Sequence, residues 1–355
     1  MRIQSVDLSQ ERIALLAEKT FGVLESKLAA ALIRYRGDQV VCVIDSQHAG
    51  KKAAEVIGIG GEIPIVGSLE EALRYEPSVL ILGIAPPGGR LPQEWRGWIV
   101  RALEAGLSVM SGLHTFLAED AEFAALARKT GARIWDVRRP PDDLPVGAMR
   151  ALEIPAKRIL TVGSDCRVGK MVAALEMDRE AQKRGIRSAF CATGQIGIMI
   201  AGSGIAVDAV VSDFVSGATE MILLERYQTT GAEWLFVEGQ GSIQHPSYSG
   251  VTLGLLHGSL PEAMILCHHA SRRHVARFEG LPIPPLVELI AMYETAAAWL
   301  VPAKVVGIAL NTFDLDESQA RRAVRQAAEE TGLPATDPVR FGAGVLVDAL
   351  QEVLG

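Results

Sequence analysis

The stretch Arg158-Ile-Leu-Thr-Val-Gly-Ser-Asp-Cys-Arg-Val-Gly-Lys-Met171 decides the fold of this chain, because it is typical of a buried strand that enters a glycine loop and then a helix. In such a loop, backbone N–H groups and the positive end of the following helix point at an anion. Lys170 adds a full positive charge at that position. The order of elements therefore predicts a binding site for a polyphosphate ligand.

The spacing of the glycines departs from the usual phosphate loop. That loop is G-x-x-x-x-G-K-[ST], whereas here five residues separate Gly163 from Gly169 and a methionine follows Lys170, which leaves no hydroxyl for a magnesium ion. The alternative is that the glycines only form a tight turn between strand and helix. We expect the phosphate-binding residues to be Gly163, Ser164, Asp165, Cys166, Arg167, Val168, Gly169, Lys170 and Met171.

The composition is that of a soluble protein with a well-formed core. The chain has 355 residues, of which 49% are hydrophobic and 22% charged, which is enough for two domains. A net charge of −7 argues against general nucleic-acid binding. The sequence has no apolar run of about 20 residues, so we expect no membrane helix. The four cysteines are scattered and therefore indicate neither a disulfide framework nor a metal site. This pattern favours a reducing, cytoplasmic location. We expect a small-molecule substrate, and the apolar content is compatible with a homo-oligomer.

Short apolar runs alternate with helical stretches, which is typical of parallel α/β sheets. The expected helices of the first half are 69–73 and 95–105. The segment Val137–Gly147, dense in proline and charge, breaks the alternation. We therefore predict two α/β domains, over residues 1–145 and 146–355. The expected strands are 40–44, 79–82, 108–110, 159–162, 188–192, 234–237, 263–267 and 305–310.

The strand expected at 234–237 delivers Glu238-Gly-Gln-Gly-Ser242 at its carboxyl end, where open parallel sheets place ligand-binding residues. Glu238 lies near the phosphate loop if the two strands are neighbours. A carboxylate there can hold a metal or a water molecule or act as a general base; the alternative is a solvated side chain in a turn. The glycines allow a close approach to a ligand, and we assign Gly239 and Gln240 to substrate binding.

Three other positions offer polar groups to a ligand. Thr193–Gly204 is glycine-rich and apolar, and we interpret it as a lid or pocket wall in which Gln195 orients a substrate, or as a segment packed against the helices. His245, beside Pro246, is the leading acid–base candidate, unless it only binds backbone. Asn311 ends a strand and offers a donor and an acceptor to a nucleotide base, unless it caps a helix.

The first half of the chain has its own candidates. Ile81–Arg90 ends a strand with prolines and glycines that stiffen a possible anion-binding loop, with Arg90 within reach. Asp45 ends the preceding strand, where a Rossmann-like unit often holds a ribose, but no G-x-G-x-x-G follows the first strand, which disfavours nicotinamide binding. His114 follows a third strand at the same edge. Together these edges predict an interdomain cleft.

Several of these strings resemble one known family, the D-glutamate N-acetyltransferase (DgcN-like) proteins, long catalogued as a domain of unknown function. The resemblance extends over nearly the whole chain. It implies a Rossmann-like N-terminal domain joined to a P-loop domain, whose glycine loop is similar to that of dethiobiotin synthetase. The matching strings are 34–36, 43–46, 49–51, 83–92, 111–115, 162–171, 192–195, 238–242, 245–246 and 252–258.

This resemblance implies transfer of an acetyl group from acetyl-CoA to the amine of D-glutamate, as a first step in breaking down that amino acid. The glycine loop and Lys170 then hold the phosphates of coenzyme A without hydrolysing them. We expect Glu238 or His245 to deprotonate the substrate ammonium. Backbone N–H groups near Gly239 or Gly241 stabilise the oxyanion. Arg90 or Lys51 pairs with a substrate carboxylate, with His114 at the same edge.

Two other functions fit the residues. One is an ATP-dependent ligase or kinase resembling dethiobiotin synthetase, with Asp165, Lys170 and Glu238 around magnesium; the family usually has threonine where this chain has Ser164 and Val172, and the second change removes a hydroxyl. The other is a nucleotide-sensing protein that binds tightly without turnover. Dependence on ATP and magnesium separates the ligase from the transferase.

Overall fold

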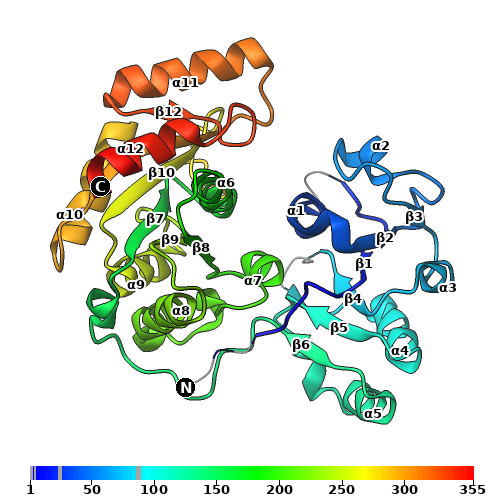
Figure 1. The fold of residues 1–355 in the computed structure, drawn as a ribbon. Coiled ribbons are helices and arrows are strands. Elements are labelled where there is room, and N and C mark those ends of the chain that lie inside the picture. Colours follow the sequence, from blue (N-terminus) through cyan, green and yellow to red (C-terminus); the bar gives the residue numbers. More distant parts are fainter. Residues whose placement is uncertain (1–2, 4, 23–25, 85–88) are drawn as a thin grey trace. The chain divides into compact units, whose positions relative to one another are not determined.

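The computed structural model describes residues 3, 5–22, 26–84 and 89–355, and the chain folds into two compact units (Figure 1). Pro140–Gly197 and Gly204–Gly355 belong to the C-terminal unit. Most residues before Pro140 form the N-terminal unit. Ile198–Ser203, although later in the chain, also belong to this unit. The change of unit falls within the proline-rich segment that the sequence marks as a break.

The N-terminal unit contains a six-stranded parallel sheet in the order β3-β2-β1-β4-β5-β6. This is the strand order of a Rossmann fold. Apolar residues fill its central strands, which are buried along their whole length. The strands are β1 (Ile13–Leu16), β2 (Val40–Ile44), β3 (Ile65–Val66), β4 (Val79–Leu82), β5 (Ser108–Ser111) and β6 (Ile134–Asp136).

Helices connect these strands, and two of those described, α3 and α5, begin at a side-chain cap. Asp120, for example, caps α5 by accepting the N–H groups of Glu122 and Phe123. A glycine in the left-handed region, Gly131, ends the same helix. The helices are α1 (Lys27–Arg36), α2 (Ala53–Ile57), α3 (Leu69–Ala72), α4 (Arg96–Glu104) and α5 (Ala121–Thr130).

The C-terminal unit contains a second six-stranded parallel sheet, in the order β12-β11-β10-β7-β9-β8 (Figure 1). β7, which leads into the glycine loop, pairs with β9 on one side and β10 on the other. The predicted α/β class of both units is therefore confirmed. The strands are β7 (Lys157–Gly163), β8 (Ser188–Cys191), β9 (Trp234–Val237), β10 (Ala263–His269), β11 (Lys304–Asn311) and β12 (Ala335–Thr336).

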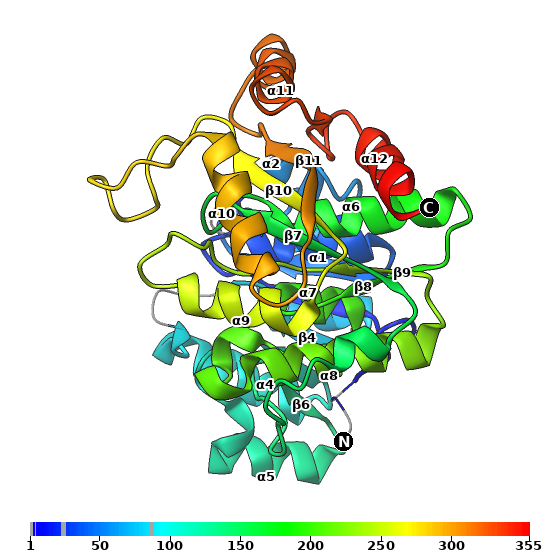
Figure 2. The same ribbon diagram turned by 90° about the vertical axis from the view of Figure 1, so that its left-hand side faces the viewer.

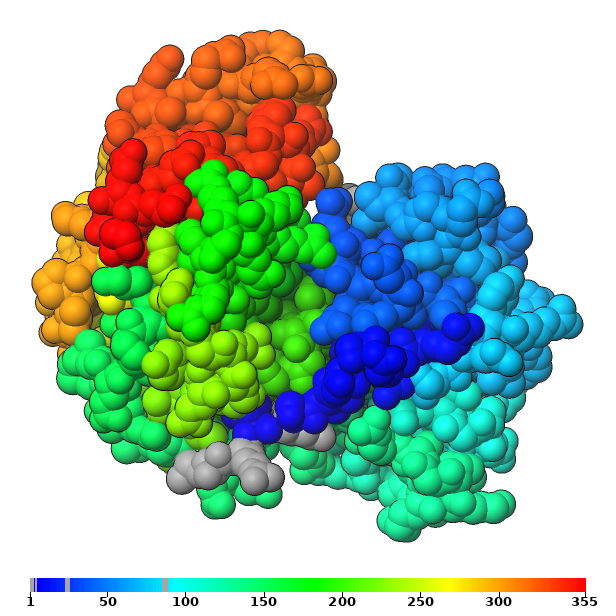
Figure 3. Space-filling view, in the orientation of Figure 1, coloured from blue at the N-terminus to red at the C-terminus, as the bar shows by residue number. Residues whose placement is uncertain are grey.

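A helix follows each strand of this sheet after a turn or loop, except after β10. Residues 270–285, which contain no helix or strand, connect β10 to the next helix. This segment is the yellow loop of Figure 2. Figure 3 shows α11 and α12, in orange and red, at the surface of the unit. The helices are α6 (Lys170–Lys183), α7 (Gln195–Ala201), α8 (Val215–Thr230), α9 (Ser249–Ser259), α10 (Leu286–Ala298), α11 (Glu317–Thr331) and α12 (Gly344–Leu354).

Thr193–Gly204, interpreted as a lid or pocket wall or as a segment packed against the helices, contains the helix α7, whose Ile198 and Met199 are fully buried. This burial favours the packed alternative, and it stabilises a helix that Gly197 disfavours. None of the helices in the described part of the chain is long and apolar enough to cross a membrane.

Candidate functional site

The glycine loop joins β7 to α6 in a conformation that exposes backbone donors. Its turn depends on two residues in the left-handed region, Arg167 at φ 58° and Gly169 at φ 106°. Gly169 is the N-cap of α6, and no described side chain caps the helix there. The first N–H groups of a helix need a partner, so this end of α6 is suited to an anionic ligand.

Lys170 lies beneath the loop and is only 7% exposed. Its ammonium donates to the backbone oxygens of Asp165, at 2.8 Å, and Gly241, at 2.7 Å. Burial lowers the pKa of Lys170, because the charged form loses its hydration. Among the described residues its ammonium contacts no carboxylate, so an anion bound in the loop would supply the missing opposite charge.

Two residues that the sequence did not reveal hold the loop from the sheet side. The hydroxyl of Tyr293 donates to the carbonyl of Gly163 at 2.7 Å and accepts the N–H of Ile243 at 3.0 Å. His268 Nδ1 lies 2.9 Å from the Ser164 hydroxyl. Burial lowers the pKa of His268 to about 4, so this imidazole is neutral near pH 7 and adds no positive charge to the site.

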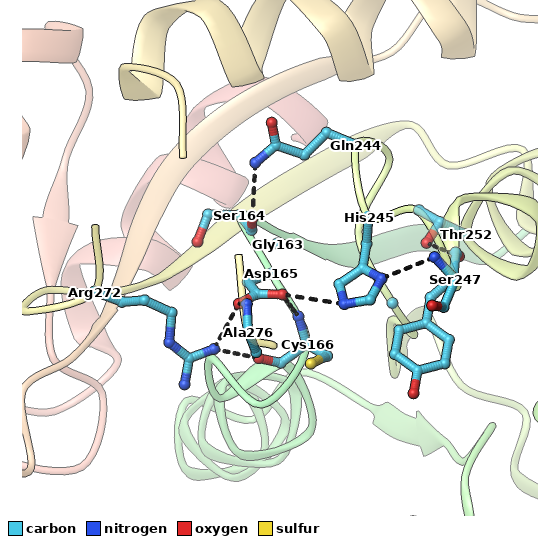
Figure 4. A network of polar contacts seen from close by, with 12 residues as sticks. Gly163, Ser164, Asp165, Cys166, Gln244, His245, Ser247, Thr252, Arg272 and Ala276 are labelled. Carbon is cyan, nitrogen blue, oxygen red and sulfur yellow. Dashed lines mark hydrogen bonds and ion pairs between the residues drawn. The ribbon is translucent and has the colours of Figure 1, made fainter. Parts of the chain in front are cut away.

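Asp165 is the centre of the polar network in Figure 4. Its fully buried carboxylate accepts from Arg272 at 2.9 Å and from the N–H groups of Ala276, at 2.8 Å, and Cys166, at 2.7 Å. Arg272 also donates to the carbonyl of Cys166 at 2.6 Å. Both carboxylate oxygens are therefore engaged in fixing the loop, which leaves Asp165 poorly placed to hold magnesium as the ligase alternative requires.

His245 packs beside Asp165 but is poorly arranged to act as a base. The N–H of Ser247 donates to His245 Nδ1 at 3.1 Å, so the neutral ring carries its proton on Nε2, which faces Asp165 Oδ1 at 3.8 Å. Tyr248 stacks on the ring with centroids 4.4 Å apart. No lone pair of the imidazole is free in this arrangement, so the structure favours the structural alternative for His245.

Asp165, Cys166 and His245 also bring three possible metal ligands together, with one ligand atom from each within 4.8 Å of the others. A metal-bound histidine normally donates its second ring N–H to an acceptor. Here the second nitrogen accepts a backbone N–H instead. The Arg272 guanidinium further neutralises Asp165, so the cluster is better described as a hydrogen-bonded support of the loop.

Glu238 follows β9, and because β9 pairs with β7 it lies beside the glycine loop. Its Oε2 accepts the N–H groups of Thr193 at 3.0 Å and Gly194 at 3.1 Å. Among the described residues no hydrogen-bond donor contacts Oε1. Burial raises the pKa of Glu238 to about 7, which is the range of an efficient general base at neutral pH.

The first turn of α7 has room for Glu238 only because Gly197 lacks a side chain. A Cβ at Gly197 would lie 2.3 Å from Glu238 Oε2 and 3.1 Å from its Cδ. These distances are far below a van der Waals contact. Glycine at this position is therefore required for the orientation of the carboxylate.

The substitution Gly197→Ala is expected to displace Glu238 and lower turnover by about 10-fold or more, because the carboxylate would leave the position in which the N–H groups of Thr193 and Gly194 hold it. Gly250→Ala on α9 is the matched control, since a Cβ there meets no atom within 4 Å. Steady-state rates of both variants test the prediction. Equal rates for Gly197→Ala and the unaltered protein would show that the position of Glu238 is unimportant.

Other candidates of the C-terminal unit lie around the same sheet edge. Gln195 starts α7 and is half-buried, and Gln240 Nε2 donates to the Thr193 hydroxyl at 3.2 Å. The N–H of Gly239 donates to the Thr161 hydroxyl at 3.0 Å, so of the two oxyanion donors expected near Gly239 or Gly241 the N–H of Gly241 is the better candidate. Asn311 ends β11 beside the loop, 3.8 Å from a Cβ built on Gly169.

The candidates of the N-terminal unit lie at the carboxyl edge of its own sheet. Lys51 follows β2 and is exposed, as is Arg90 after β4. The N–H of His114 donates to the carbonyl of Gly89 at 2.7 Å, which joins the loops after β4 and β5. Residues 85–88 of the predicted anion-binding loop lie outside the described residues. The interdomain cleft stays a prediction.

The fold and site define a two-domain α/β protein in which a Rossmann-like unit is followed by a P-loop unit. The family of unknown function DUF1611 matches this chain in both parts, as a Rossmann-like domain over residues 46–140 and a P-loop domain over 145–347. The chain belongs to this family, which confirms the resemblance seen in its sequence strings.

Proteins with known names and structures extend the comparison. The D-glutamate N-acetyltransferase of Tritonibacter scottomollicae is 40% identical over 334 residues, which cover 93% of this chain and 96% of that protein. The D-glutamate N-acetyltransferase of a Pseudoalteromonas species is 37% identical, over 79% of this chain and 83% of that one. A crystal structure of a DUF1611 protein from Anabaena variabilis superposes with a TM-score of 0.91 at 44% identity, over 97% of this chain and 100% of that chain.

Proposed function

We propose that this chain is an N-acetyltransferase that moves the acetyl group of acetyl-CoA to the amine of D-glutamate. The observation that carries the proposal is the 40% identity to a D-glutamate N-acetyltransferase over nearly the full length of both chains. The free thiols of all four cysteines are compatible with a reducing, cytoplasmic environment.

The glycine loop fits the phosphates of coenzyme A. The uncapped start of α6 offers N–H donors, and the buried ammonium of Lys170 contacts only carbonyl oxygens of the described residues. A pyrophosphate would satisfy both. The absence of a hydroxyl at Met171 is no obstacle, because holding coenzyme A requires no magnesium. Asn311, at the end of the neighbouring β11, would lie at the nucleotide base.

Glu238 is the residue best placed to remove a proton from the substrate ammonium. Its Oε2 is fixed by two backbone N–H groups, which leaves Oε1 for the proton. The freed amine then forms the new C–N bond as the thioester C–S bond breaks. The nitrogen loses its second proton as the amide forms, the leaving thiolate takes up that proton by way of solvent, and Glu238 returns the first proton to solvent. The N–H of Gly241 would stabilise the charge on the acetyl oxygen. Arg90 or Lys51 would pair with a carboxylate of D-glutamate.

Calorimetric titration separates this function from the ligase or kinase. The purified protein is titrated with acetyl-CoA alone and, separately, with ATP plus magnesium. The same two additions are tested by thermal shift, since a ligand that binds the native state raises its stability. Binding of acetyl-CoA without magnesium is the expected result. A response to ATP with magnesium alone would overturn the transferase, and binding without turnover of D-glutamate would favour a nucleotide sensor.

The role of His245 can be tested by substitution. His245→Gln is expected to lower turnover by less than about 10-fold, whereas loss of a general base typically lowers it by about 10²-fold or more. The reason is that both ring nitrogens face fixed partners, Ser247 and Asp165. Steady-state kinetics at saturating substrate measures the effect. A drop as large as that of a Glu238 variant would restore His245 as the base.

A further inference from the structure

A basic run stands beside the glycine loop and has no role in the reaction described above. Between His268 and Arg277 the chain contains three arginines and three histidines and no acidic residue, although its net charge is −7. The run begins at the end of β10, the neighbour of β7. It continues into the 270–285 segment.

The 270–285 segment is folded back on itself and has a defined shape. The N–H of Ile283 donates to the carbonyl of Arg273, and the N–H of Val275 donates to the carbonyl of Leu281, both at 2.9 Å. His274 and Pro282 form an antiparallel bridge between the two arms. Val275 is buried. The arms therefore hold the side chains of residues 273–277 in a fixed region.

Three hydrogen bonds, two from Arg272 and one from the N–H of Ala276, attach this segment to the glycine loop (Figure 4). Arg272 and the N–H of Ala276 both bind the carboxylate of Asp165. The ring of Phe278 packs edge-on against His245, with centroids 5.5 Å apart. Arg272 and Arg273 both lower the pKa of His268, which itself touches Ser164. Arg272 and Ala276 thus lie against the phosphate loop, and Arg273 and Arg277 are their direct neighbours in the chain.

Most of the positive charge here is not neutralised by the protein. Arg272 is paired with Asp165, but Arg167, Arg273 and Arg277 are exposed and form no ion pair within the described residues. Among the nearby acids, Asp314 is bound to Ser271, at 2.5 Å, and to His269, at 3.1 Å. Within the 270–285 segment itself, Glu279 is the one acidic residue.

We propose that Arg273 and Arg277, together with Arg167, form a second phosphate site next to the glycine loop, and that it takes the 3′-phosphate of coenzyme A. This inference rests on the proposed function and names the part of the cosubstrate that the glycine loop does not hold. Donors of the loop and Lys170 suffice for one pyrophosphate, whereas a phosphate monoester carries up to two further charges. Arginine is the residue that best recognises such a group, through paired hydrogen bonds.

The test compares coenzyme A with dephospho-coenzyme A, which lacks only the 3′-phosphate, by calorimetry on the full-length protein. The unaltered protein is expected to bind coenzyme A at least ~10-fold more tightly, the factor that corresponds to one good charge-assisted contact. The double variant Arg273→Gln/Arg277→Gln is expected to lose this preference while its affinity for dephospho-coenzyme A stays within about 2-fold. Arg325→Gln, an exposed arginine on α11, is the matched control and should keep the preference.

The outcomes distinguish this site from the proposed function. If the unaltered protein binds neither compound, the proposed function fails and the second site fails with it. Equal affinities for the two compounds, or a preference retained by the double variant, would overturn the second site alone. Thermal unfolding of each variant checks the fold, and the single variants replace the double one if its melting temperature falls.

Discussion

Replacing Glu238 by Gln is expected to lower turnover by about 10²-fold or more, with a much smaller effect on the affinity for acetyl-CoA, because the substitution removes a proton acceptor and preserves shape. The Gln oxygen can still accept the N–H groups of Thr193 and Gly194. Glu220→Gln is the matched control. Glu220, on helix α8, is a second buried glutamate, and its carboxylate accepts the N–H of Ala148 at 2.9 Å. The Glu220→Gln variant should keep nearly full turnover.

The pH dependence of turnover gives an independent readout of Glu238. Its pKa is raised to about 7, so the carboxyl is mostly protonated below that pH and cannot accept a proton. Turnover of the unaltered enzyme should therefore fall about 10-fold for each pH unit below 7 and level off above it. This limb should vanish in the Glu238→Gln variant. A limb that persists in the variant would assign the titration to another group.

The same shift predicts an effect on stability with the opposite sign. The folded state binds a proton on Glu238 more tightly than the unfolded chain does, so this contribution to stability is present at low pH and is lost as pH rises from 4.5, the ordinary pKa of a glutamate, to about 7. Glu238→Gln avoids this loss. At pH 8 the variant is expected to be more stable by on the order of 2 kcal/mol, as chemical unfolding would show.

Replacing Lys170 by Met is expected to weaken binding of acetyl-CoA by about 10²-fold, because a buried charge–phosphate interaction is among the strongest polar contacts. Stability should change little, since loss of two hydrogen bonds to carbonyl groups is offset by removal of a buried charge. Lys183→Met, at the other end of α6 and exposed, is the matched control. Calorimetry with acetyl-CoA measures the effect, and an affinity within 3-fold of the unaltered protein, roughly 0.7 kcal/mol, would contradict it.

Local sequence patterns predicted those elements whose signals are local. Val79–Leu82 is a short apolar run between turn residues, and the structure has a strand with the same bounds. The strand–loop–helix order around Lys170 is likewise confirmed. Ile13–Leu16 escaped prediction although it is one of the two central strands of its sheet, because five apolar residues between Arg12 and Glu18 give a weak signal. α7 depends on burial of Ile198 and Met199, which only the tertiary structure provides.

The candidate site shows the same division. Glu238 could be named from its place after a strand, but its nearness to the glycine loop depends on the pairing of β7 with β9, which no local pattern specifies. Arg272 escaped prediction, because it lies 107 residues from Asp165 in the chain. His245 is suited to proton transfer by its residue type, but in the structure its Nδ1 accepts the N–H of Ser247. Residue type thus indicates which chemistry a side chain can perform, whereas its hydrogen-bond partners depend on the tertiary structure.

The most direct test of the account is a coupled measurement of product and thiol release. The purified protein is incubated with acetyl-CoA and D-glutamate, and N-acetyl-D-glutamate is quantified by mass spectrometry beside free coenzyme A. We predict equal amounts of the two products, without added ATP or magnesium, and almost none with Glu238→Gln. Absence of N-acetyl-D-glutamate from a folded protein that binds acetyl-CoA, or full activity of the Glu238→Gln variant, would contradict the account.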